Sequence, residues 1–118
     1  AKVNAATANH TNIVKWMSAN FTKCSTGAPH ITYKTNSSGS TTNFSCTQNA
    51  QNHSTYMINH LKFDGFNNPY VASEAAAYAS SSTNPPDGRT YIYCTGNNCR
   101  ITTDTGSNTN KSATVVKE

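Results

Sequence analysis

Charged residues are scarce in this 118-residue chain. Nine lysines and arginines and five aspartates and glutamates make up 12% of it, about half the usual share. The basic residues form no cluster, so the net charge of +4 leaves no visible nucleic-acid footprint. Hydrophobic residues reach only 35%, and no apolar run approaches the roughly 18 residues of a membrane-spanning helix. These limits predict one domain, residues 1–118, with a modest core.

Sequence motifs of enzyme catalysis are also missing. The chain has neither a Gly-x-Ser-x-Gly elbow nor a His-Glu-x-x-His pair. The carboxylates are scattered along the chain: Asp64, Glu74, Asp87, Asp104 and Glu118. We therefore expect no enzyme activity, no catalytic residue, no cofactor and no bound metal.

Small polar residues are abundant where charged ones are scarce. The chain has 16 asparagines, 13 serines and 18 threonines. Eleven aromatic residues argue against simple disorder. Chance explains most of the Asn-x-Ser/Thr triplets in such a composition, and glycosylation at any of them requires export. These triplets begin at Asn9, Asn20, Asn36, Asn43, Asn52 and Asn110.

Four cysteines in a small polar chain indicate disulfides formed in an oxidising compartment. Three pairings are open, and the spacing favours Cys24–Cys46 and Cys94–Cys99. A zinc site is the alternative, but Cys24 and Cys46 stand too far apart for the usual paired ligands. The loop-entropy model assigns about 2 kcal/mol to the shorter loop and about 3–4 kcal/mol to the longer one.

Residues 91–102 predict a β-hairpin with a Gly-Asn turn at 96–97. This register places Cys94 opposite Cys99, so one disulfide joins directly facing residues. The same face carries two isoleucines: Ile92 and Ile101. The opposite face carries Tyr91, Tyr93, Arg100 and Thr102. Tyr91 and Tyr93 beside Arg100 are candidates to stack on a partner or a nucleobase, or to cover a neighbouring strand.

Residues 1–23 predict an amphipathic helix, because apolar side chains recur every three or four positions. No N-cap residue precedes Ala1, so either a short coil leads into the helix or the helix continues from upstream. We expect His10, on the apolar stripe, to be a hydrogen-bonded packing residue. The side chains expected to join helix and sheet are Val3, Ala6, Ile13, Val14, Met17, Phe21, Ile92 and Ile101.

The middle of the chain alternates short apolar segments with turn residues. Two further cation sites are conceivable. His53 and His60 would share a helix face and supply two metal ligands, although surface histidines are the simpler interpretation. Asp104, Asn108 and Asn110 offer oxygen ligands for calcium, although a solvated loop is the simpler interpretation. The expected elements are strands at 30–35, 41–46 and 112–117, a helix within 48–62, a helical turn at 75–77, and loops at 36–40, 63–70, 84–88 and 104–111.

The order of elements predicts an α+β fold, disulfide-stabilised, with an N-terminal amphipathic helix packed on one face of an antiparallel sheet. Residues 24–70 form a disulfide-tied connecting region between the helix and the C-terminal strands at 90–118. This layout, together with short strings at 12–17, 21–24, 68–70 and 73–76, resembles the soluble head of a type IV pilin.

The resemblance implies a structural subunit of an extracellular, bacterial cell-surface pilus. Such a subunit is anchored in the inner membrane before assembly and polymerises through an apolar N-terminal half-helix that is absent from residues 1–118. Its partners would be copies of itself, other pilins and the pilus assembly machinery, in adhesion, motility or DNA uptake. The alternatives are a minor pilin, a pseudopilin, or a secreted adhesin-like module that binds glycan, surface or DNA.

Overall fold

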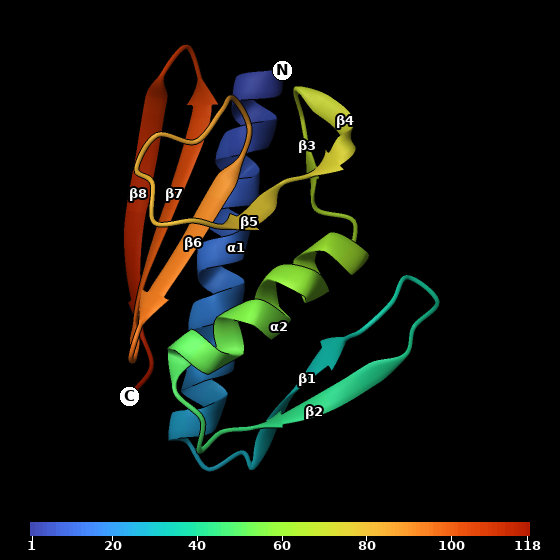
Figure 1. Cartoon of the computed structure of the whole chain (residues 1–118), viewed down its shortest axis with the longest axis vertical. Helices are drawn as coiled ribbons and strands as arrows, with labels where there is room; N and C mark the ends of the chain where they lie inside the picture. The colour runs from blue at the N-terminus through green and yellow to red at the C-terminus, as the bar shows by residue number, and fades with distance from the viewer.

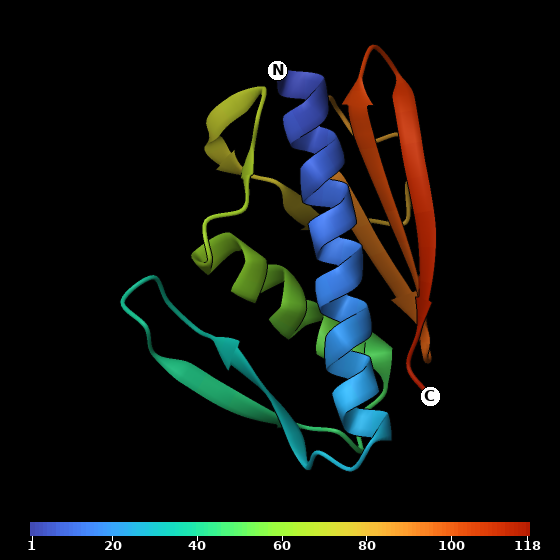
Figure 2. The same ribbon diagram turned by 180° about the vertical axis from the view of Figure 1, so that it is seen from behind.

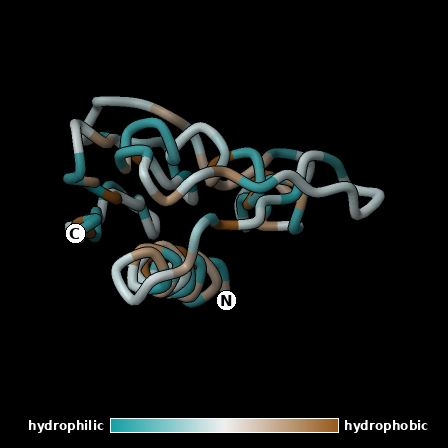
Figure 3. Tube along the Cα trace, turned by 90° about the horizontal axis from the view of Figure 1, so that it is seen from below, coloured by the Kyte–Doolittle hydropathy of each residue, from teal (hydrophilic) through white to brown (hydrophobic).

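The computed structural model describes the whole chain, residues 1–118, as two helices and eight strands. Helix α1 (Lys2–Ser25) runs along the molecule beside a four-stranded sheet. Helix α2 (Ala50–Phe63) runs obliquely across α1 (Figure 1). Seen end-on in Figure 3, α1 forms a layer of its own against the rest of the chain. The fold is α+β, as expected, and no helix has both the length and the apolarity to cross a membrane.

The apolar stripe of α1 faces the sheet over most of its length. Ile13, Met17 and Phe21 belong to the core cluster, and Val14 packs against it. Ala6 and His10 are also buried. Val3 departs from the expectation, because it is 52% exposed. It lies beside the turn at Gly106, at the end of the sheet, where no further layer covers the first turn of the helix.

The connecting region after α1 begins as a β-hairpin, as predicted. Strands β1 (His30–Lys34) and β2 (Thr41–Ser45) pair antiparallel. The Cys24–Cys46 disulfide is present and joins the end of α1 to the end of β2, with a Cα–Cα distance of 5.3 Å. Figures 1 and 2 show the hairpin projecting to one side of the helix–sheet body.

The predicted second helix is α2, which begins after the N-cap Asn49. The segment 63–70 is not entirely a loop, because β3 (Asn67–Asn68) pairs there with β4 (Val71–Ala75). The helical turn expected at 75–77 is wrong. Ala75 ends β4 and Ala77 begins the next strand, because the backbone of this segment hydrogen-bonds to neighbouring strands rather than to itself.

The C-terminal half forms a sheet in the order β5-β6-β7-β8. Its strands are β5 (Ala77–Ala79), β6 (Thr90–Thr95), β7 (Asn98–Gly106) and β8 (Thr109–Val116). The pairs β6–β7 and β7–β8 are antiparallel, but β5 runs parallel to β6. A parallel neighbour needs a crossover connection, which the loop over residues 80–89 provides, so the expectation of a wholly antiparallel sheet is corrected.

The hairpin register read from the sequence is confirmed. Cys94 faces Cys99 and forms the second disulfide, and Ile92 faces Ile101. Gly96 has φ +58°, which the first position of the two-residue turn requires. Both isoleucines are buried, whereas Tyr93 on the opposite face is 40% exposed.

The polar loop expected at 104–111 is mostly strand. β7 extends to Gly106, β8 starts at Thr109, and only the Ser107-Asn108 turn remains, with both φ angles positive. Asp104 is buried. The loop over residues 80–89 crosses the outer face of the sheet before it reaches β6 (Figure 1), and its last residues, Gly88 and Arg89, hydrogen-bond to the backbone of Asp104.

Candidate functional site

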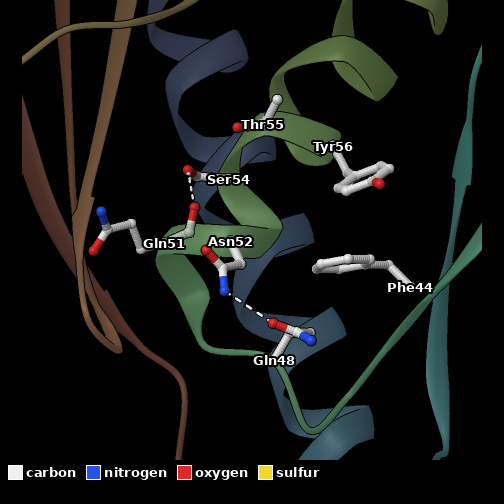
Figure 4. Close-up of a pocket in the computed structure, with 7 residues that line it drawn as sticks. All are labelled: Phe44, Gln48, Gln51, Asn52, Ser54, Thr55 and Tyr56. Atoms are coloured by element: carbon white, nitrogen blue, oxygen red, sulfur yellow. Dashed lines mark hydrogen bonds between the residues drawn. The ribbon is translucent and has the colours of Figure 1, made fainter.

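The largest hollow on the surface lies between β2 and α2 and measures about 650 Å³. We call it the β2–α2 groove, and Figure 4 shows its lining. No charged residue contributes to it. The lining consists of two aromatic side chains, three amides and two hydroxyls: Phe44, Tyr56, Gln48, Gln51, Asn52, Ser54 and Thr55.

The position of the groove depends on how the start of α2 is held. Asn49 caps the helix, with its side chain accepting from the backbone N–H of Asn52 at 2.9 Å. The β6–β7 turn supplies two more bonds, because the side chain of Asn97 accepts from Ala50 N–H at 3.0 Å and Gly96 C=O accepts from Gln51 N–H at 2.9 Å. Three of the N–H groups that a helix start leaves unpaired are thus satisfied.

One wall of the groove is an aromatic stack. The rings of Phe44 and Tyr56 lie 4.4 Å apart and nearly parallel, and Figure 4 shows them face to face. On the other side, Asn52 donates to the side-chain oxygen of Gln48 at 2.9 Å. The wall is therefore stiff and partly apolar, while the amide side presents donors and acceptors to solvent.

Beneath the stack, His53 and Tyr33 form a buried polar pair. Both side chains are fully buried. His53 Nε2 donates to the carbonyl of Ser45 at 2.9 Å, so Nδ1 is the acceptor from the Tyr33 hydroxyl at 2.8 Å. Burial lowers the pKa of His53 and raises the pKa of Tyr33 well above its ordinary range.

His60 is packed in the same region. Its ring stacks on Trp16, with centroids 4.7 Å apart, and its Nδ1 accepts the backbone N–H of Lys34 at 2.8 Å. Burial is the main cause that lowers its pKa, and the Asp64 carboxylate opposes this shift. His53 is therefore a core residue and His60 a half-buried one, so neither is the fully exposed histidine of the simpler interpretation.

The chemistry of the lining is that of uncharged hydrogen-bonding groups beside aromatic rings. Its Ser54, Thr55 and Tyr56 hydroxyls have no carboxylate, histidine or cysteine beside them among the lining residues. An aromatic wall opposite amides and hydroxyls matches an uncharged ligand with many hydroxyl groups. No group of three or more histidines, cysteines, aspartates or glutamates is placed to hold a metal ion.

The other candidates from the sequence lie apart from the groove. Tyr93 stacks with Arg100 at 5.4 Å on the outer face of the sheet, and Arg100 also donates to the carbonyl of Ser81. Asn110 donates to the carbonyl of Thr83 at 3.2 Å. The Arg100 and Asn110 contacts fasten the crossover loop to the sheet, whereas Tyr93 remains 40% exposed.

His10 is the hydrogen-bonded packing residue that was predicted. Its Nδ1 lies 2.8 Å from the Thr103 hydroxyl, which in turn lies 2.7 Å from the Thr90 hydroxyl. Burial lowers the pKa of His10, and Lys111 lowers it further.

The sequence analysis missed two kinds of functional contact. Asn97 holds the start of α2 through a hydrogen bond between residues 47 positions apart, and no local sequence pattern predicts this bond. Tyr33 did carry a signal, since it stands two positions after Ile31 on the same face of a predicted strand. That alternation would have placed both side chains in the core, where they are found.

Comparison with known proteins gave no match to a family model, to a curated protein or to a solved structure. The fold, the two disulfides and the surfaces described above are therefore the features that bear on its function.

Proposed function

We propose that this chain is the globular head of a pilin-like subunit of an extracellular filament on a bacterial surface. The observation that carries the proposal is the placement of α1. At 1.5 Å per residue its 24 residues span about 36 Å, and the longest extent of the molecule is 41 Å. Figure 2 shows this helix uncovered along the front, with only one side against the sheet.

The uncovered face of α1 suits close packing against other helices. Most of its exposed residues are small and uncharged, among them Ala5, Ala8, Ser18 and Ala19. In the proposal, an apolar helical segment precedes Ala1 and bundles in the filament centre, with other pilins and the assembly machinery as partners. The disulfides agree with an oxidising compartment.

Mass spectrometry of filaments sheared from cells tests the proposal. We expect the native subunit to carry an apolar segment before Ala1, with a processed N-terminus. Ala8→Arg and Ala19→Arg should abolish filaments while leaving the head folded, because both sites are exposed and a charge buried between subunits is unfavourable. Ser37→Arg, in the distant β1–β2 loop, is the matched control. A native chain that starts near Ala1, or variants that still polymerise, would refute the proposal.

A second candidate function is supported by the β2–α2 groove. A secreted or filament-borne module could use its aromatic wall and amides to bind a neutral oligosaccharide. Titration of labelled protein with neutral oligosaccharides should shift the signals of Gln48, Asn52 and Thr55, and Gln48→Ala should weaken the effect. Asn98→Ala, exposed and outside the groove, is the control. Shifts confined to other surfaces would rule this candidate out.

A further inference from the structure

The six Asn-x-Ser/Thr triplets lie in different structural settings. In four of them the asparagine stands in a helix or strand and its amide nitrogen already donates a hydrogen bond. These bonds run from Asn9 to the Asn67 carbonyl, from Asn20 to the Trp16 carbonyl, from Asn52 to the Gln48 side chain and from Asn110 to the Thr83 carbonyl, over 2.9–3.2 Å. A nitrogen held in this way is not presented to a modifying enzyme.

The fifth triplet, at Asn43, is held by its strand. Asn43 pairs with Thr32 across the β1–β2 ladder, and its side-chain oxygen accepts from the Thr32 hydroxyl at 2.8 Å. The hydroxyl two positions on, that of Ser45, is 2.8 Å from the Thr47 hydroxyl. An enzyme would have to unpair the strand to bind this triplet in a bent conformation.

Asn36 is different, because it stands in the exposed loop between β1 and β2. Its side-chain oxygen accepts from the backbone N–H groups of Ser38 at 2.9 Å and Ser40 at 3.2 Å. Its amide nitrogen and the Ser38 hydroxyl have no partner within the chain, and both residues are exposed. Figures 1 and 2 show this loop at the tip of the projecting hairpin, away from both helices and the large sheet.

We propose that Asn36 is the acceptor of an N-linked glycan. The reaction joins Asn36 Nδ2 to C1 of a sugar and breaks the bond between C1 and a phosphate oxygen of a polyprenyl-diphosphate-linked oligosaccharide. Polyprenyl diphosphate leaves, and the Nδ2 proton passes to a base of the transferase. The two N–H donors on the Asn36 oxygen draw electron density from the amide, which favours loss of that proton.

The third residue of the triplet, Ser38, has two separable contributions. Its backbone N–H bonds to Asn36 and shapes the turn, whereas its hydroxyl is free for the transferase to recognise. Ser38→Ala removes the hydroxyl and keeps the backbone bond. Ser37→Ala changes the middle residue of the triplet, which the recognition pattern leaves open, and is therefore the matched control.

The test incubates the folded, oxidised protein with a transferase that reads Asn-x-Ser/Thr and a polyprenyl-diphosphate oligosaccharide. Intact mass should rise by one glycan per chain. Asn36→Gln and Ser38→Ala should lose this increase, while Ser37→Ala and Asn43→Gln should keep it. Circular dichroism and the intact disulfide mass show that each variant is folded.

The reduced, unfolded chain, with all six triplets accessible, serves as the positive control for the transferase. Transfer to the unfolded chain but not to the folded one would overturn the proposal. So would a glycan that persists in Asn36→Gln, or one mapped to another triplet. The transferase and its oligosaccharide donor are chosen by their activity on the unfolded chain. Each result with the folded protein therefore supports or contradicts the role of Asn36. None of these results depends on filament assembly.

Discussion

Acidification should destabilise this protein at pH values well above those at which carboxylates titrate. His10 and His53 are buried and His60 is half-buried, and burial lowers the pKa of each. A group whose pKa is lower in the folded state binds fewer protons there than in the unfolded chain, so stability falls as pH decreases below the unfolded value of about 6.5. Nearby Lys111, Lys117 and Lys34 add to the lowering.

Hydrogen bonding explains why His60 resists protonation. Its Nδ1 accepts a backbone N–H from Lys34, and that donor cannot reverse its role, so a proton on Nδ1 would face another proton. A proton on His53 Nδ1 would likewise force the Tyr33 hydroxyl hydrogen away from its only partner. Each histidine held neutral contributes a slope of at most about 1.4 kcal/mol per pH unit, so the upper limit for three is about 4 kcal/mol per pH unit.

Urea unfolding between about pH 8 and about pH 5 measures this dependence. His60→Asn keeps an acceptor near Lys34 but cannot titrate. We expect the pH slope of this variant to fall by up to about 1.4 kcal/mol per pH unit, even though loss of the Trp16 stack lowers its stability at every pH. Asn98→Ala, at an exposed residue that carries no titratable group, should leave the slope unchanged. A wild-type unfolding midpoint that is the same at both ends of the range would refute the reasoning.

Three further predictions concern stability. Removing both cysteines of the Cys94–Cys99 pair should lower stability by about 2 kcal/mol, and removing Cys24–Cys46 by about 3–4 kcal/mol, because the second loop is longer; calorimetry that reverses this order would contradict the loop argument. Asn97→Ala should cost about 1 kcal/mol in urea unfolding, since Ala50 N–H loses its partner, whereas Asn98→Ala should have little effect. Gly88→Ala should destabilise strongly, because the new Cβ would overlap the Asn68 side-chain oxygen. Gly39→Ala, with open space around it, should cost only about 1–2 kcal/mol of backbone strain, and equal thermal midpoints for the two variants would disprove the steric account.

The elements that could be predicted from the sequence are those with a short-range signal. The stripe of α1 repeats over more than four turns, and the Gly-Asn turn together with the facing cysteines leaves only one self-consistent register for β6 and β7. The spacing favours the two disulfides that are present, and the hairpin register supports Cys94–Cys99. Apart from Cys24 and Cys46, which are 22 positions apart, the residues that decide these structures lie within a few positions of each other or repeat with one period.

The elements that could not be predicted depend on distant contacts. Ala75 to Ala77 read as helix by intrinsic propensity, but Thr90 N–H bonds to the Ala76 carbonyl and Ala77 pairs with Thr90. The sequence pattern places Asp104 in a loop, but its backbone bonds to Gly88 and Arg89 at the end of the crossover loop. For the same reason the β2–α2 groove is invisible in the sequence, because its two walls come together only after α2 has docked on the β6–β7 turn.

The core combines few apolar side chains with polar residues that satisfy one another. Thr90, Thr103 and His10 form one hydrogen-bonded chain, and Tyr33, His53 and the Ser45 carbonyl form another. No buried side-chain nitrogen or oxygen lacks a partner, so these groups avoid the penalty of an unpaired polar atom. Because burial in these networks lowers the pKa of His10 and His53, the same contacts that let a chain with 35% hydrophobic residues form a core also make its stability sensitive to mild acid.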